Sequence, residues 1–306
     1  MASYSKPSIE ELRTLVSHYP IGQILDMAPQ EGGQANTSYR IKTDTGSYML
    51  SICDEKTHRE IQVLLQVLNQ LNANRFPTST PIATREGQYL LEFQGKPVYL
   101  KAFIPGQVVP DLSPAMLEGV GQAMAQLHAI PAPEAVAPAF PYGFTAFDSY
   151  LAAPVDHDFT PWLREQKALL EREMDKEMPK GLIHGDIFWD NLVFEGEGLK
   201  AILDFEEACN DYFLFDLGMA AVGCCSRGGT FVEDRVKALI RGYESRCPLS
   251  DREREQLPLF MVYAATAGAF WRFCQYNIHH PDPQLKDSHR ELSALGDINR
   301  ARSLKI

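Results

Sequence analysis

The 306-residue sequence lacks several features that would place it in a specialised class of protein. Its six cysteines form no C-x-x-C pair, so no zinc-binding framework is visible. The N-terminal stretch MASYSKPSIEELRTLV has no apolar signal core, and no run of about 18 apolar residues follows it. These absences predict a soluble protein of the reducing cytoplasm that does not enter a membrane.

Positive charge is also scarce. The chain has 29 Lys and Arg residues against 40 Asp and Glu residues, which gives a formal net charge of -11. The phosphate backbone of a nucleic acid would repel such a chain, so no nucleic-acid partner is expected. The sequence contains no internal repeat and no low-complexity tract. Its length exceeds what one small core needs and predicts two domains.

The N-terminal part alternates short apolar segments with Gly-containing turns. Residues 24–43 and 46–53 are predicted to form strands, and residues 89–106 a hairpin around Gln94-Gly95. Apolar residues at helical spacing predict a short helix over residues 8–19 and a longer one over residues 55–71. The first ~105 residues therefore predict a mostly antiparallel sheet with one inserted helix.

Helical patterns dominate after Pro105-Gly106. Ser113 and Pro114 are typical of a helix start, and further helices are expected around residues 159–177, 231–246 and 251–278. Between them, GLIHGDIFWDNLVFEG and LKAILDFEEAC each place a short apolar run beside a polar cluster, with the Gly-rich EGEG joining them. This pattern predicts a small hairpin inside a helical domain. The predicted domains are residues 1–103 and 104–306.

The polar cluster LIHGDIFWDN carries the strongest chemical signal. Asn191 follows Asp186 by five residues, and Asp204 ends the next apolar run. Each residue alone could cap a turn. Together, three oxygen-bearing side chains gathered by a hairpin suit a hard cation such as Mg²⁺. The spacing matches the phosphoryl-transfer template, in which an aspartate receives the acceptor's proton and an asparagine and a second aspartate hold the metal.

These segments resemble the aminoglycoside phosphotransferase and choline kinase superfamily of kinase-like enzymes, and most closely the type II homoserine kinases. The resemblance is carried by LIHGDIFWDNLVF, ILDFEEACNDYFLFDL, ANTSYRIKTDTGSYML, VYLKAFIPG and VGQAMAQLHAI, in the family's order. It implies an α+β, protein-kinase-like fold with two lobes. The small N-lobe has an antiparallel sheet with one helix, the larger C-lobe is mainly helical, and ATP binds in the cleft between them.

The resemblance also implies roles for individual residues. Asp186 is expected to be the catalytic base that orients and deprotonates the acceptor hydroxyl, while Asn191 and Asp204 ligate Mg²⁺. His184 and Asp216 are expected to support the catalytic loop. The residues expected to bind the nucleotide, through a phosphate loop, a helix glutamate and backbone groups of the hinge, are Gly32, Gly33, Asn36, Lys42, Glu60, Lys101 and Phe103.

One part of the kinase pattern is missing. The strand SYMLSIC has Ser51 where a kinase carries its phosphate-binding lysine. Either another cation, such as Lys42 or Arg40, meets the phosphate charge, or nucleotide affinity is low. Glu60 then lacks the strand lysine with which such a glutamate normally pairs.

The expected activity is ATP- and Mg²⁺-dependent phosphorylation of a small hydroxyl-bearing metabolite. L-homoserine, giving O-phosphohomoserine on the way to threonine, is the leading acceptor. A kinase of choline, ethanolamine, hydroxylysine, an aminoglycoside or a sugar is the first alternative. A non-catalytic nucleotide-binding pseudokinase is the second, and the missing lysine is its only support.

An amino-acid acceptor needs an anion for its ammonium and a cation for its carboxylate. The candidates are Glu206, Trp271, Arg272 and Tyr276. For Glu206 and its neighbour Glu207 a solvated acidic surface is an equal alternative, and for the aromatic residues core packing is the alternative. Arg272 needs a partner, which is either a substrate carboxylate or a buried acid.

Overall fold

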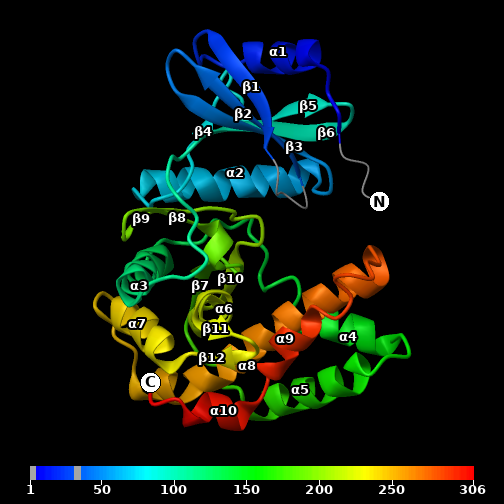
Figure 1. Ribbon diagram of the computed structural model, residues 1–306, viewed down its shortest axis with the longest axis vertical. Coiled ribbons are helices and arrows are strands. Elements are labelled where there is room, and N and C mark those ends of the chain that lie inside the picture. The colour runs from blue at the N-terminus through cyan, green and yellow to red at the C-terminus, as the bar shows by residue number, and fades with distance from the viewer. Residues whose placement is uncertain (1–4, 31–35) are drawn as a thin grey trace. The chain divides into compact units, whose positions relative to one another are not determined.

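The computed structural model describes residues 5–30 and 36–306, and the chain forms two compact units, residues 1–106 and 107–306 (Figure 1). The first unit contains an antiparallel sheet and the second is mainly helical. Both features agree with the α+β class expected from the sequence. Gly32 and Gly33, expected to bind phosphate, lie outside the described residues.

The described part of the N-terminal unit is built on a six-stranded antiparallel sheet. Its strand order is β1-β2-β3-β6-β4, and β5 also pairs with β6. Gln94 and Gly95 both have positive φ, which makes the tight turn between β5 and β6. The strands are β1 (Ile24–Gln30), β2 (Asn36–Thr43), β3 (Ser47–Cys53), β4 (Pro81–Ile82), β5 (Leu91–Phe93) and β6 (Lys96–Ala102).

Two helices, α1 (Ile9–Ser17) and α2 (His58–Ala73), lie on opposite sides of this sheet (Figure 1). Each begins with a capping box, in which Ser8 or Thr57 exchanges hydrogen bonds with a glutamate three residues later. The apolar stripe of α1 packs on one face of the sheet. That core includes Leu12, Leu15, Ile41, Leu50, Ile52, Val98 and Leu100.

Asp54, directly after β3, joins three segments of the N-terminal unit. Its side chain is only 3% exposed and forms an ion pair with Lys96. It also accepts hydrogen bonds from the Thr37 hydroxyl at 2.6 Å and from the Ser5 hydroxyl at 2.8 Å. Burial alone would raise the pKa of Asp54, but these donors outweigh burial and lower it.

Replacing Asp54 with asparagine is expected to destabilise the protein by about 2 kcal/mol at neutral pH. Because the folded-state pKa is lowered, the charge of Asp54 stabilises the fold above its unfolded-state pKa of about 3.9. That stabilisation disappears as the pH falls through the folded-state value. Urea unfolding followed by circular dichroism from pH 7 to pH 3 measures the difference between wild type and variant.

The matched control is Asp26→Asn, which removes an exposed carboxylate from β1. Its free energy of unfolding should stay close to that of wild type at every pH. An Asp54→Asn difference that is the same at pH 3 and pH 7 would show that the charge of Asp54 does not stabilise the fold.

The helices of the C-terminal unit surround short two-stranded sheets. The hairpin β8–β9 and the pair β7–β10 carry the residues of the polar cluster, and a third pair, β11–β12, follows α6. The helices are α3 (Pro114–His128), α4 (Phe144–Ala152), α5 (Phe159–Glu173), α6 (Phe213–Cys225), α7 (Glu233–Glu244), α8 (Asp251–Cys274), α9 (His289–Ala294) and α10 (Ile298–Ser303). The strands are β7 (Lys180–Ile183), β8 (Leu192–Glu195), β9 (Gly198–Ile202), β10 (Cys209–Tyr212), β11 (Ser226–Arg227) and β12 (Thr230–Phe231).

Helix α8 is the longest of these and continues into a π-helical turn, Gln275–His279. By length and composition alone, the span Asp251–His279 is long and apolar enough to cross a membrane. However, 78% of its most apolar window is buried inside the structure. Such burial is typical of the core helix of a soluble protein, so this span is weak evidence for a membrane segment.

Candidate active site

The hairpin β8–β9 brings two predicted metal ligands together. Asn191 directly precedes β8, and Asp204 lies two residues after β9 ends at Ile202. Leu192 pairs with Ile202, and the Leu203 N–H donates to the Asn191 carbonyl at 2.8 Å. The two ligand-bearing segments therefore lie side by side at the open end of the hairpin.

Asp204 has an unusual backbone conformation. Its φ is +63°, in the left-handed region that is unfavourable for most L-residues but that aspartate tolerates. The side chain is exposed, and no described residue forms a hydrogen bond or ion pair with it. A strained residue with an uncommitted carboxylate is a common feature of functional sites.

Asp186 is held against Asn191. The Asn191 side-chain amide donates to the Asp186 carbonyl at 2.9 Å and to its Oδ2 at 3.2 Å. Burial and the nearby charges of Asp204, Glu207 and Asp190 raise the pKa of Asp186 to about 7. A carboxylate with that pKa accepts a proton more readily than an ordinary one, as a general base must.

His184 fixes the backbone of the same loop. It is fully buried, its Nε2 donates to the Leu203 carbonyl at 2.8 Å, and its Nδ1 accepts from the Asp186 N–H at 3.1 Å. These two bonds require the neutral tautomer with the proton on Nε2. Burial lowers the pKa of His184, which favours this neutral form. His184 therefore ties the Asp186 segment to the Asp204 segment.

Asp216, on α6, anchors the loop from beneath. Its carboxylate accepts the N–H of His184 at 3.1 Å and the N–H of Gly185 at 2.8 Å. Burial opposes the charge of Asp216, but His128, His184 and the Gly185 N–H outweigh it and lower its pKa. Gly185 has φ +82°, so the turn that presents these two N–H groups suits glycine.

His128 completes this buried network, although no sequence pattern assigned a role to that residue. Its Nε2 lies 3.1 Å from Asp216 Oδ2, and its Nδ1 lies 3.0 Å from the Tyr243 hydroxyl. The segment VGQAMAQLHAI was part of the family resemblance, but nothing in it indicated a partner 88 residues away. Side chains of α3, α6 and α7 are thus linked in one buried network next to the loop that carries Asp186.

The donor set of Asn191 and Asp204 fits a Mg²⁺ ion that shares its coordination with phosphates and water. Asn191 uses its amide N–H₂ on Asp186, which leaves its oxygen Oδ1 for a cation. In the described part of the chain, no three His, Cys, Asp or Glu side chains form a metal-binding cluster. Magnesium is usually held by one or two protein ligands plus substrate phosphates, so two ligands suffice.

The expected hinge needs a correction. The Phe103 N–H donates to the Ser47 carbonyl at 3.0 Å, so it is already used within the sheet. Lys101 lies inside β6, paired with Met49 on one side and Pro81 on the other. The side chain of Phe103 instead packs under the guanidinium of Arg40, whose Cζ lies 4.1 Å from the ring centroid.

Glu60 also has a different role from the one expected. Its carboxylate accepts hydrogen bonds from the Thr57 N–H at 2.8 Å and the Thr57 hydroxyl at 2.7 Å, which closes the capping box of α2. The residue lies in the first, exposed turn of the helix. Its carboxylate is therefore committed to the helix start and not to the nucleotide. Asn36 and Lys42 both lie on β2.

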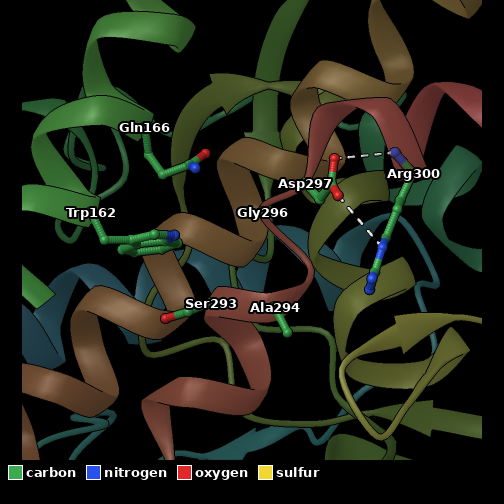
Figure 2. A pocket seen from close by; sticks show the side chains of 7 residues that line it. All are labelled: Trp162, Gln166, Ser293, Ala294, Gly296, Asp297 and Arg300. Carbon is green, nitrogen blue, oxygen red and sulfur yellow. Dashed lines mark hydrogen bonds and ion pairs between the residues drawn. The ribbon is translucent and has the colours of Figure 1, made fainter.

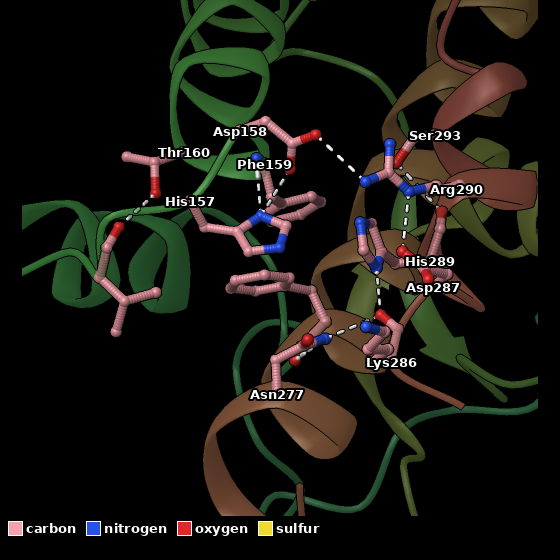
Figure 3. Close-up of polar contacts among 12 residues, drawn as sticks. His157, Asp158, Phe159, Thr160, Asn277, Lys286, Asp287, His289, Arg290 and Ser293 are labelled. Carbon is pink, nitrogen blue, oxygen red and sulfur yellow. Dashed lines mark hydrogen bonds and ion pairs between the residues drawn. The ribbon is translucent and has the colours of Figure 1, made fainter. Parts of the chain in front are cut away.

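Arg272 finds its partner in the protein. Its guanidinium donates to the Ser288 carbonyl at 3.2 Å. Nearby, the Asn277 side chain donates to the Lys286 carbonyl at 2.9 Å (Figure 3). These bonds fasten the segment after α8 to that helix, which corrects the assumption that Arg272 needs a substrate carboxylate or a buried acid. Trp271 and Tyr276 are half-buried and pack edge to face, with ring centroids 6.0 Å apart.

Glu207 lies beside the loop that carries Asp186. Its carbonyl oxygen would lie 3.0 Å from a side-chain carbon added at Gly185, and its charge contributes to the raised pKa of Asp186. Both Glu207 and Glu206 are half-buried in the turn after Asp204. From the sequence, either glutamate could bind the ammonium group of an acceptor. The effect of the Glu207 charge on the pKa of Asp186 favours Glu207 for that role.

A hollow of about 350 Å³ lies elsewhere in the C-terminal unit, among α5, α9 and α10 (Figure 2). None of the predicted site residues lines it. Its lining residues are Trp162, Gln166, Ser293, Ala294, Gly296, Asp297 and Arg300.

Comparison with known proteins defines the class of this chain. Residues 26–249 match the phosphotransferase enzyme family, abbreviated APH, so the chain belongs to that family. Together with the curated relatives below, this match shows that the protein is a small-molecule kinase. The matched range includes Asp186, Asn191 and Asp204.

Two relatives of similar length are homoserine kinases. The chain is 30% identical to a homoserine kinase of Parvibaculum lavamentivorans over 302 residues, covering 94% of this chain and 92% of that one. It is also 30% identical to a homoserine kinase of Caulobacter sp., covering 87% and 86%.

Solved structures confirm the fold. The amicoumacin kinase hAmiN, in complex with AMP-PNP, Ca²⁺ and Ami, has a TM-score of 0.75 at 13% identity and covers 96% of this chain and 95% of its own. A microcompartment-associated aminopropanol kinase has a TM-score of 0.72 at 17% identity and covers 96% and 97%. At these identities the likeness shows the kinase-like fold alone.

Proposed function

We propose that this kinase transfers the γ-phosphate of ATP to the hydroxyl of L-homoserine, with Mg²⁺ as the metal. The observation that carries the proposal is the arrangement of Asp186, Asn191 and Asp204 around one hairpin. The homoserine kinases that are 30% identical over most of the chain support the choice of acceptor. The complex of hAmiN with AMP-PNP and Ca²⁺ supports a nucleotide and a divalent cation.

In this proposal Asp186 positions the acceptor hydroxyl and receives its proton. Asn191 holds Asp186 through its amide N–H₂ and turns Oδ1 towards the metal. Asp204 would supply the charged ligand of the metal, and the bound metal would supply positive charge next to the phosphates of ATP. Catalysis then depends mainly on positioning and electrostatic stabilisation, as is typical of phosphoryl transfer.

Glu207 is proposed to meet the ammonium group of the acceptor. The charges of Asp190, Asp204 and Glu207 all act on Asp186, so the catalytic face is acidic. An acceptor that carries an amine is attracted to such a face, whereas an uncharged sugar is not. This chemistry fits homoserine, and it equally fits choline, ethanolamine and hydroxylysine.

The acceptor is tested by measuring kcat/KM with ATP and a panel of alcohols. The panel holds L-homoserine, choline, ethanolamine, hydroxylysine, an aminoglycoside and a neutral sugar. We expect L-homoserine to have the highest kcat/KM, by about 100-fold or more, because a site built for homoserine leaves polar groups unpaired with acceptors that are not amino acids and fits the longer side chain of hydroxylysine less well. ADP release in a coupled assay is the readout.

A substitution of Glu207 tests whether this residue binds the ammonium group of the acceptor. Glu207→Gln should raise the KM for homoserine by roughly 10-fold, because a charge-assisted hydrogen bond to the ammonium is lost. If another acceptor is clearly phosphorylated and homoserine is not, homoserine is the wrong acceptor, but the protein is still a small-molecule kinase.

A further inference from the structure

The missing strand lysine leaves open how the phosphates of ATP are bound. In the kinase template a lysine on the third strand pairs with the α- and β-phosphates. Ser51 takes this place in β3, is only 3% exposed, and contacts Ser38 through its hydroxyl, with an O–O distance of 3.4 Å. A serine hydroxyl carries no positive charge, so another residue must supply one if ATP is the phosphoryl donor.

The sheet register shows which cations share the face of Ser51. Successive side chains of a strand point to opposite faces, so alternate residues form rows across the sheet. Ser51 pairs with Ser38 on β2 and with Tyr99 on β6. The next row consists of Arg40, Met49 and Lys101, and the row after it contains Lys42 and Ser47. The opposite face, with Ile41, Leu50 and Leu100, packs in the core with α1.

Among the described residues of these rows, three side chains carry a positive charge, and they differ in their distance from Ser51 and in their contacts. The guanidinium of Arg40 lies over the ring of Phe103, away from the row of Ser51. Lys42 lies two rows from Ser51, near the end of β2. Lys101 lies in the row next to that of Ser51 and contacts a residue of the row of Ser51. Its Nζ lies 3.4 Å from the Tyr99 hydroxyl oxygen and 5.5 Å from the Tyr99 ring centroid.

We propose that Lys101 binds the α- and β-phosphates of ATP in place of the lysine that β3 lacks. Its ammonium contacts the hydroxyl of Tyr99, which pairs with Ser51 in the sheet. The side chain is half-buried, so its charge is less screened than that of an exposed lysine.

This inference rests on the proposed use of ATP and does not depend on the acceptor. Calorimetry of ATP–Mg²⁺ and of adenosine, without any acceptor, tests it directly. We expect Lys101→Met to weaken ATP binding by roughly 10- to 100-fold, since a hydrogen bond to a charged group is lost. Adenosine, which has no phosphate, should bind within about twofold of wild type.

Two further variants sharpen the test. Lys6→Met removes the same charge from an exposed position before α1, and it should change ATP affinity by less than about threefold. Ser51→Lys combined with Lys101→Met returns a lysine to the template position, and it should restore at least about half of the lost factor. Thermal unfolding of each variant confirms that it is folded.

The outcomes separate the possible failures. Unchanged ATP affinity in Lys101→Met overturns the role of Lys101, and so does an equal loss for ATP and adenosine, which would indicate a structural effect. If the wild-type protein does not bind ATP, then ATP is not the phosphoryl donor, and the proposed role of Lys101 fails with it.

Discussion

Replacing Asp186 with asparagine is expected to lower kcat by roughly 10²- to 10⁴-fold, the usual contribution of a positioned general base. Asparagine has nearly the same shape, so the hydrogen bond from the Asn191 amide can persist while the proton acceptor is lost. The KM for ATP should stay within a few-fold of wild type, because Asp186 acts on the acceptor hydroxyl. Steady-state kinetics with saturating acceptor measure both constants.

Asp190 offers a matched control for this experiment. It lies four residues away, is exposed, and its charge also contributes to the raised pKa of Asp186. Asp190→Asn removes the same charge without touching the proton acceptor, so kcat should change by less than about threefold. Equal losses in the two variants would mean that the net charge of the loop, and not a specific base, governs the reaction.

Replacing Asp216 with alanine is expected to be the most destabilising change, at about 3–5 kcal/mol. The substitution removes the shared acceptor of the His184 N–H, the Gly185 N–H and the His128 imidazole. These donors are buried and would remain without a partner, which is costly in a site that excludes water. All three tryptophans, Trp162, Trp189 and Trp271, lie in the same unit, so urea unfolding can be followed by their fluorescence.

Asp234→Ala is the corresponding control, because Asp234 is exposed in the first turn of α7. Its loss should cost less than about 1 kcal/mol, mainly through the helix dipole. If Asp216→Ala also costs less than about 1 kcal/mol, the carboxylate does not hold the loop in the way described. Asp216→Asn, which keeps the shape but not the charge, should fall between the two.

The candidate catalytic residues could be proposed from the sequence because their signal is local. Asp186 and Asn191 lie within six residues, and Asp204 follows across a hairpin that the Gly-rich EGEG segment indicates. The helix starts at Ser8 and Ser113 could be predicted for the same reason, since each cap depends on residues within one turn.

Other elements carried no periodic signal. Helix α6 was missed because its sequence FLFDLGMAAVGCC is apolar all round, as a fully buried helix is, and so has no amphipathic stripe. The pairing of β7 with β10 was missed because both strands have only four residues. The short helices α4, α9 and α10 likewise offer too few turns for a pattern.

Long-range contacts explain the remaining corrections. The sequence could indicate that Arg272 needs a partner, but only the fold shows that the Ser288 carbonyl supplies it. It could show that Ser51 stands where a kinase has a lysine, but not that Lys101, about 50 residues later, contacts Tyr99 in the row of Ser51. Side-chain direction depends on neighbours that the folded sheet brings together, and local spacing does not determine it.

The most direct test of the proposed reaction is to identify its product by ³¹P NMR. Wild-type protein is mixed with ATP, Mg²⁺ and L-homoserine, and the spectrum is followed over time beside a sample of Asp186→Asn. The account predicts that a phosphomonoester signal grows in step with ADP in the wild-type sample and is almost absent in the variant. Formation of ADP and inorganic phosphate without a phosphomonoester, or equal rates in both samples, would contradict it.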